Sequence, residues 1–282
     1  MNKILVPTDF SPNASKALEY AVEIAKLADA EILLLHVSDE VDAVFRRKHP
    51  LEEKHGVALD EAIEIELALI QQKISQERVS IQAKAYGGQV VPSVIDVADE
   101  YEADLIIMGS LGDTGFKEKL LGSVSAAVIG RSLVPVLVIP LLATWVHPEK
   151  MVLAINHFDD EPSLAAPAFE LAKLFKAKVT VAVFTGVDKA IAVDYLENTR
   201  GLLLYEQKLK TIYHHADIAP GMLDGHHFEE TLNDYLETND IDMLVMFTHH
   251  KHLPESIFHR SLTKKISYHT NIPLLAIPVQ KK

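Results

Sequence analysis

The sequence predicts an α/β protein of two tandem doubly wound domains, each a five-stranded parallel sheet flanked by four helices. Three observations support this fold class. The chain has 282 residues, which is enough for two ordinary domains. Its two halves repeat one another, and each half alternates short apolar runs with segments of helical periodicity. The 48% apolar and 24% charged content is typical of a globular chain.

The repeat divides the chain near its middle. Residues 103–140 and 241–278 align without a gap at an offset of 138. Shared residues are Asp104, Met108, Ser123, Pro135, Leu137, Ile139 and Pro140, which fall on Asp242, Met246, Ser261, Pro273, Leu275, Ile277 and Pro278. Near the start of each half the offset is 147, where 23–27 matches 170–174. We therefore expect domains at 1–141 and 150–282, joined near 141–149.

In the first half, strands are expected at 3–8, 31–37, 79–85, 105–108 and 136–139. The run at 31–37 is continuously apolar, as expected for a strand that is covered on both faces. Ser11 and Pro12 fit a helix N-cap and first helical residue, and apolar residues then recur at helical spacing up to Leu27. Further helices are expected at 59–77, 91–98 and 124–129.

The second half follows the same order. Its strands are expected at 151–155, 178–184, 210–215, 242–247 and 273–277, and the segment 210–215 has the weakest signal of the five. Right-handed crossovers between parallel strands would then place helices on both faces of each sheet.

Composition excludes several classes of function. Without cysteine, the chain has no disulfide scaffold, no Cys-ligated zinc or iron–sulfur site and no Cys nucleophile. The formal net charge of −13 argues against binding nucleic acid or an anionic membrane. No apolar run approaches the ~20 residues of a transmembrane helix, and the N-terminus turns polar too early for a signal peptide. We therefore expect a soluble cytoplasmic protein.

A glycine-rich segment follows the fourth strand of the first half. Gly109, Gly112 and Gly122-Ser123 give the spacing Gly-x2-Gly-x9-Gly-Ser between a strand and a helix. Gly109 and Gly112 permit close backbone approach and a positive φ. The helix that opens after Gly122 has N–H groups without helical partners and a dipole that suits a phosphate, and the hydroxyls of Ser123 and Ser125 can add donors. The segment therefore predicts a local anion site in an acidic protein.

Other candidate ligand contacts lie at the ends of neighbouring strands. Ligands of open parallel sheets bind beyond the carboxyl ends of the strands. Asp9 can accept hydrogen bonds from a ribose or help hold a metal ion. Val37 and Met108 can offer backbone groups and apolar surface to an adenine ring. Each feature also has a structural interpretation: the glycines as a turn, Asp9 as a partner of the helix N-terminus, and Val37 and Met108 as core residues. The joint spacing favours a ligand site.

With these residues the first half resembles a universal stress protein domain, whose nucleotide-binding members carry Gly-x2-Gly-x9-Gly-Ser/Thr after the fourth strand. The opening Ile-Leu-Val-Pro-Thr-Asp-Phe-Ser and the closing Ser-x2-Pro-Val-Leu-Val-Ile-Pro are also similar to that family, and the resemblance covers essentially the whole chain as a tandem pair. It implies ATP binding, with or without Mg2+, weak or no hydrolysis, and a regulatory or stress-response role. The residues it implies are Pro7, Thr8, Asp9 and Val37 around the adenosine, and Met108, Gly109, Gly112, Gly122, Ser123, Val124 and Ser125 around ribose and phosphates.

The resemblance also implies how the domains associate. In that family the last strand pairs two domains, so 136–139 and 274–277 are expected to join the halves into an internal pseudo-dimer. Covering an apolar edge strand in this way is physically reasonable. A homodimer is a further option, and the protein partner is not identified.

The second half departs from the glycine pattern. By position, Gly109, Gly112 and Gly122 become Phe247, His250 and Arg260, Ser261 is retained, and His157 replaces Asp9. Side chains at these positions would occupy the space of the phosphates. We therefore expect nucleotide to bind in the N-terminal domain only.

No metal ligands and no catalytic residues are predicted. Eleven of the 14 His lie after residue 141, but adjacent His on one strand or helix point to different faces, and His-Glu-x-x-His is absent. The chain also lacks a P-loop lysine motif, a Ser-Gly-Gly-x-Asp-Ser loop and His-x-Gly-His. Beside a nucleotide-binding regulatory module, two alternatives stay open: a weak ATP-hydrolysing enzyme, and a scaffold or interaction protein in which the glycine motif is a relic.

Overall fold

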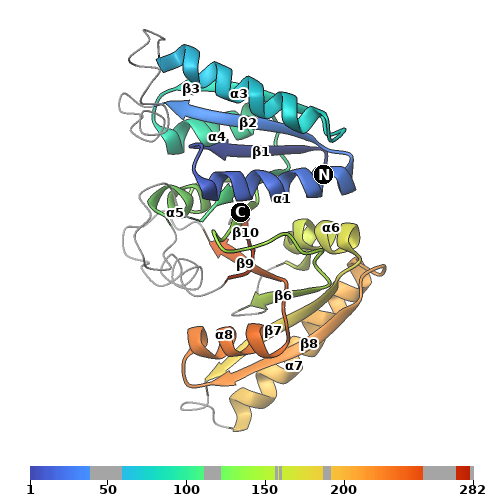
Figure 1. The fold of residues 1–282 in the computed structure, drawn as a ribbon. Coiled ribbons are helices and arrows are strands. Elements are labelled where there is room, and N and C mark those ends of the chain that lie inside the picture. Colours follow the sequence, from blue (N-terminus) through green and yellow to red (C-terminus); the bar gives the residue numbers. More distant parts are fainter. Residues whose placement is uncertain are drawn as a thin grey trace. The chain divides into compact units, whose positions relative to one another are not determined.

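Each half of the chain forms five parallel strands with helices between them. The computed structural model describes residues 1–38, 59–110, 122–155, 158, 161–186, 192–249 and 271–279. They divide into two units, Met1–Trp145 and Val146–Lys282. Within each unit, strands and helices alternate along the chain (Figure 1). The predicted class of tandem doubly wound α/β domains is confirmed.

The elements of the first unit are β1 (Lys3–Thr8), α1 (Pro12–Ala28), β2 (Glu31–Ser38), α3 (Leu59–Ser75), β3 (Ile81–Gly87), α4 (Val90–Glu100), β4 (Leu105–Gly109), α5 (Ser123–Ile129) and β5 (Val136–Ile139). Its strand order is β3-β2-β1-β4-β5, and every pair is parallel. Because β1 lies between β2 and β4, the strand order reverses beside β1. All the strands point the same way, as β1 and β2 show in Figure 1. Their carboxyl ends therefore share one edge of the sheet.

Helix α1 follows the sequence signals closely. Ser11 is its N-cap and Pro12 its first residue, as predicted. The helix ends at Asp29, which adopts the left-handed conformation with φ 54°, and Ala30 N–H then bonds the carbonyl of Ala25. The buried face of α1 packs against β1 and β4. These contacts set the start of α1 against the end of β4.

The elements of the second unit are β6 (Lys150–Ile155), η2 (Pro162–Ala165), α6 (Ala166–Phe175), β7 (Lys178–Gly186), α7 (Ala192–Ile212), β8 (Ile218–Gly225), α8 (Phe228–Thr238), β9 (Met243–His249) and β10 (Leu274–Val279). Its order β8-β7-β6-β9-β10 repeats that of the first unit, again with parallel pairs. None of the helices in the described part of the chain is long and apolar enough to span a bilayer.

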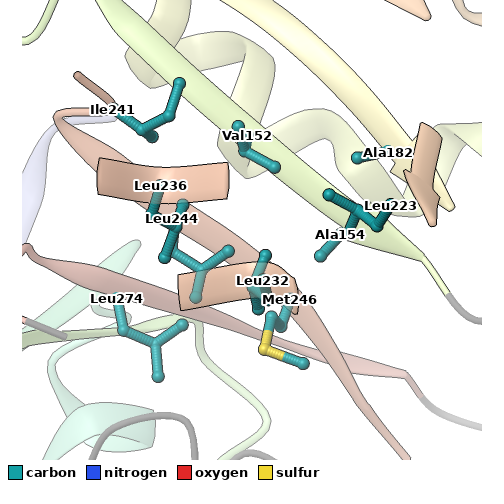
Figure 2. Packing of buried hydrophobic residues seen from close by; sticks show 10 residues of the cluster. All are labelled: Val152, Ala154, Ala182, Leu223, Leu232, Leu236, Ile241, Leu244, Met246 and Leu274. Carbon is teal, nitrogen blue, oxygen red and sulfur yellow. The ribbon is translucent and has the colours of Figure 1, made fainter. Parts of the chain in front are cut away.

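Helix α8 covers one face of the second sheet. Leu232 and Leu236 of the helix are buried in a cluster with residues of five strands, among them Val152 and Leu244 (Figure 2). Full burial of a leucine side chain contributes about 1.5–3 kcal/mol.

Equivalent hydrogen bonds show that the units are copies of one structure. Asp104 accepts from Asn2 and Lys3 N–H, and Asp242 accepts from Glu149 and Lys150 N–H. In each pair one carboxylate ties the start of the first strand to the start of the fourth. The offset of 138 between the two carboxylates is the one seen in the sequence.

The prediction of a strand at 210–215 is wrong. Residues up to Ile212 form the end of α7, where Leu209 and Tyr213 are buried one helical turn apart. The third strand is instead β8, whose sequence contains Pro220 and Gly221. An edge strand tolerates proline, because one side of its backbone needs no partner strand. Because of this proline, the sequence pattern did not indicate a strand at these residues.

Candidate functional site

The turn from β1 to α1 carries Asp9 at the carboxyl edge of the first sheet. Thr8 Oγ1 accepts a hydrogen bond from Phe10 N–H at 3.0 Å, and Asp9 Oδ1 accepts one from Ser11 N–H at 3.0 Å. Phe10 has φ 58°, a left-handed conformation that costs a non-glycine residue about 1–2 kcal/mol. The Ser11 hydroxyl caps α1 by accepting from Ala14 N–H at 3.1 Å. Together these bonds fix where the half-buried Asp9 lies.

The end of β2 lies directly beside this turn. Thr8 and His36 are register partners in the parallel pair β1–β2. His36 Nδ1 is 2.9 Å from the Thr8 carbonyl oxygen, and its ring centroid is 4.6 Å from that of Phe10. Val37, the next residue, is buried, whereas Pro7 is half-buried. Val37 can therefore meet a ligand chiefly through its backbone.

The end of β4 packs tightly against the first turn of α1. A Cβ atom on Gly109 would lie 2.7 Å from Asn13 Nδ2 and 3.1 Å from the Asn13 backbone carbonyl carbon. Asn13 Nδ2 also donates to Ser110 Oγ at 3.5 Å. Gly109 therefore makes a close contact with Asn13, and its expected contact with a ligand stays a prediction. Gly109 does not have a positive φ, so that part of the expectation is wrong. Met108 is buried.

The start of α5 is bonded to the same strand end. Gly122 is the N-cap, and its N–H donates to the Ser110 carbonyl at 2.5 Å. Ser125 is buried, and its hydroxyl donates to the Gly109 carbonyl at 2.7 Å. The hydroxyl hydrogen of Ser125 is thus engaged within the protein. Its direct contribution here is to hold α5 against β4.

Ser123 and Val124 lie on the exposed side of the same turn. The first N–H groups of any α-helix lack acceptors within the helix, and Gly122 has no side chain with which to cap them. Since α5 has only seven residues, these local N–H groups matter more than a long helix dipole. They are suitable donors for an anion.

The first unit thus gathers most of the predicted residues at one edge. Ten of them lie at the ends of β1, β2 and β4, in the β1–α1 turn, or at the start of α5: Pro7, Thr8, Asp9, Val37, Met108, Gly109, Gly122, Ser123, Val124 and Ser125. Gly112 lies outside the described residues. Sequence reasoning gave no role to His36, Asn13 or Ser110. A histidine inside an apolar run was the available signal for His36.

The corresponding edge of the second unit has different side chains. Gly109 pairs with Ile139, and Phe247 pairs with Ile277, so strand register puts Phe247 in the place of Gly109 as predicted. Lys3 and Lys150 occupy equivalent positions at the strand starts. Counting from them, Asp9 corresponds to Asn156, so the expectation of His157 is wrong by one residue.

Several residues named for the second unit fall outside the described part: Asn156, His157, His250, Arg260 and Ser261. Within the part that is described, no group of three or more His, Asp or Glu side chains could hold a metal ion.

Comparison with known proteins gives a consistent result. The family model "Universal stress protein family" matches residues 1–140 and 148–278. Universal stress protein YxiE of Bacillus subtilis is 33% identical over an alignment of 146 residues, which covers 49% of this chain and 98% of that protein. Universal stress protein MJ0577 of Methanocaldococcus jannaschii is 34% identical over 153 residues, covering 49% of this chain and 93% of that protein. A crystal structure of a universal stress protein from Archaeoglobus fulgidus covers 98% of both chains with a TM-score of 0.73; at 18% identity it shows the fold alone.

Proposed function

The chain belongs to the universal stress protein family, whose role is in the stress response, and from this premise we propose that its first unit binds an adenine nucleotide as a regulatory signal. The two units would then have different tasks. The first would bind the ligand, and the second would keep the scaffold without a nucleotide site.

One observation carries this proposal. The first turn of α1, the end of β4 and the start of α5 are held together by hydrogen bonds and packing at a single edge of the sheet. Gly122 N–H bonds Ser110, Ser125 Oγ bonds Gly109, and Gly109 lies against Asn13. A ligand seated at this edge would meet a preorganised backbone, which reduces the conformational entropy lost on binding.

The chemistry of the edge suits the parts of a nucleotide. The N–H groups at Ser123 and Val124 would bind phosphate oxygens through local dipoles, which can act even in a chain of net charge −13. Asp9 would accept from ribose hydroxyls. The backbone beside Val37 and Met108 would flank the adenine ring.

Asp9 also fits a magnesium site. Mg2+ in nucleotide sites is commonly held by one or two carboxylates together with phosphate oxygens. Asp9 would supply the carboxylate oxygen, while its Oδ1 keeps the Ser11 N–H in place. Bound Mg2+ would neutralise part of the phosphate charge.

The difference between the units supports binding in the first unit only. A phenyl ring at Phe247 stands where the first unit has a glycine without a Cβ atom. In the first unit this place lies against Asn13 of α1, so the ring changes the packing beneath the edge at which the nucleotide would bind. We therefore propose one nucleotide per chain.

Mass spectrometry of the small molecules released by heat from freshly purified protein tests this function. Adenine nucleotide is expected from the wild type, and a Gly122→Arg variant, which imitates the arginine found in the second half, should release none. Calorimetric titration of the emptied protein with AMP, ADP and ATP should give one site per chain. Two equivalent sites would contradict the assignment to one unit. No binding of any of the three would favour the scaffold interpretation.

A further inference from the structure

His36 is a buried imidazole that follows four apolar residues of β2. It is 2% exposed and lies in β2 between Leu35 and Val37, both of which are buried. A polar ring is costly to bury unless it forms hydrogen bonds. Its neighbours in β2 show that an aliphatic residue could occupy this strand. The imidazole therefore has a role that an aliphatic side chain does not fill.

Its contacts lie on both sides of Asp9. His36 Nδ1 is 2.9 Å from the carbonyl oxygen of Thr8. Because a carbonyl can only accept, Nδ1 must carry the hydrogen and donate it. The same ring lies 4.6 Å, at an interplanar angle of 31°, from the ring of Phe10. One side chain thus holds the residue before Asp9 and the residue after it.

This turn needs support from its surroundings. The positive φ of Phe10 is unfavourable for a phenylalanine and persists only where neighbouring contacts stabilise it. The Phe10 and Ser11 N–H groups donate to Thr8 and Asp9 side chains, so the turn and the direction of Asp9 are coupled. Removing the His36 Nδ1–H group, which donates to the Thr8 carbonyl, would loosen the same turn.

The second unit provides an internal comparison. At the register position of Thr8 and His36 it has Ile155 and Val183, both buried. An apolar pair thus joins β6 to β7 at the place where a polar pair joins β1 to β2. The fold of the unit therefore does not require the imidazole. The histidine occurs in the unit that has Gly109, and valine occurs in the unit that has Phe247.

We propose that His36 is a positioning residue of the first unit: by donating from Nδ1 to the Thr8 carbonyl and packing on Phe10, it holds Asp9 in the orientation that receives the ligand. This inference rests on the proposed function, because the ligand is the adenine nucleotide of that proposal. His36 itself acts through the turn and does not need to touch the nucleotide.

The test compares three variants in the full chain. His36→Val copies the second unit and removes the donor. His36→Asn retains a donor, because the asparagine Nδ2 can occupy nearly the place of the imidazole Nδ1. Val183→Ala is the matched control, a buried substitution at the equivalent place in the second unit. Should His36→Val fail to fold, His36→Phe replaces it, since a phenyl ring keeps the packing on Phe10 and lacks the donor.

Two measurements are made on each variant: ATP affinity by calorimetry, and amide hydrogen exchange of Phe10 and Ser11 without nucleotide. In His36→Val, ATP affinity should fall about tenfold, the equivalent of one hydrogen bond. The two amides should exchange about tenfold faster, while the amide of Ala21 in the middle of α1 is unchanged. His36→Asn should restore both values to near wild type, and Val183→Ala should change neither.

The outcomes separate the two proposals. Should the wild type not bind nucleotide, the proposed function fails, whatever the exchange rates are. Should the wild type bind and His36→Val bind equally well, the positioning role is refuted. Equal losses in the valine and asparagine variants would also refute it, because the donor would then not be the property that matters.

Discussion

Substitution of Gly109 by alanine should strain the contact between β4 and α1. The added Cβ atom would lie 2.7 Å from Asn13 Nδ2, 2.8 Å from its Cγ and 3.1 Å from its backbone carbonyl carbon. Comfortable carbon contacts are about 3.5–4.0 Å, so the asparagine side chain must move by most of an ångström. Overpacking of this kind typically costs about 1–3 kcal/mol. We expect Gly109→Ala to destabilise the first unit within that range.

A second substitution separates the two parts of this strain. Asn13→Ala removes Nδ2 and Cγ, the two nearest atoms, but leaves the backbone carbon. Alone it should cost about 0.5–1.5 kcal/mol, because the 3.5 Å hydrogen bond to Ser110 is lost. In the double variant the side-chain overlap is absent, so the two costs should not add. The double variant should be about 1 kcal/mol more stable than the sum of the two single costs predicts.

Trp145 allows the stability of the first unit to be measured separately. It is the single tryptophan of the chain, and its ring packs edge-on against Tyr20 of α1 at 5.1 Å. Urea denaturation followed by tryptophan fluorescence therefore reports the unfolding of that unit, and a midpoint shift at constant slope measures the change in stability. Strictly additive costs of Gly109→Ala and Asn13→Ala would refute the packing argument.

Three further predictions concern other contacts. Ser125→Ala removes the 2.7 Å hydrogen bond to the end of β4 and should cost the first unit about 1 kcal/mol in the same urea assay, with weaker nucleotide binding; unchanged stability would contradict the bond. Asp104→Asn should lower the urea midpoint seen by Trp145 by weakening two backbone bonds, whereas Asp242→Asn should change only the circular dichroism transition of the second unit. Burial raises the pKa of Tyr213 above its ordinary value of 10.0. The neutral phenol is therefore favoured in the folded state, and its stabilisation is present below pH 10 and lost as the pH rises through the folded pKa; Tyr213→Phe should flatten this alkaline loss in denaturation curves at stepped pH.

Much of the fold was predictable because it depends on local patterns. Apolar runs bounded by polar turns identified β1, β2, β4 and β5, and Ser11-Pro12 identified the start of α1. The gap-free offset of 138 predicted Phe247 in the place of Gly109, and strand register confirms it. The failure at β8 has the same origin, since Pro220 and Gly221 interrupt the local pattern of an edge strand.

The sequence by itself determined the duplication, the alternation of strands and helices, and the edge of the sheet at which the chemistry had to lie. Only the tertiary structure decided that Gly109 lies against Asn13, that Ser125 bonds the end of β4, and that His36 holds the residues around Asp9. The physical reason is the range of the interactions. Periodicity and caps involve residues a few positions apart. These contacts join residues that are distant in the chain, as does the hydrogen bond from Asn13 to Ser110, which spans 97 positions, and they exist only after the parallel strands have brought their ends together.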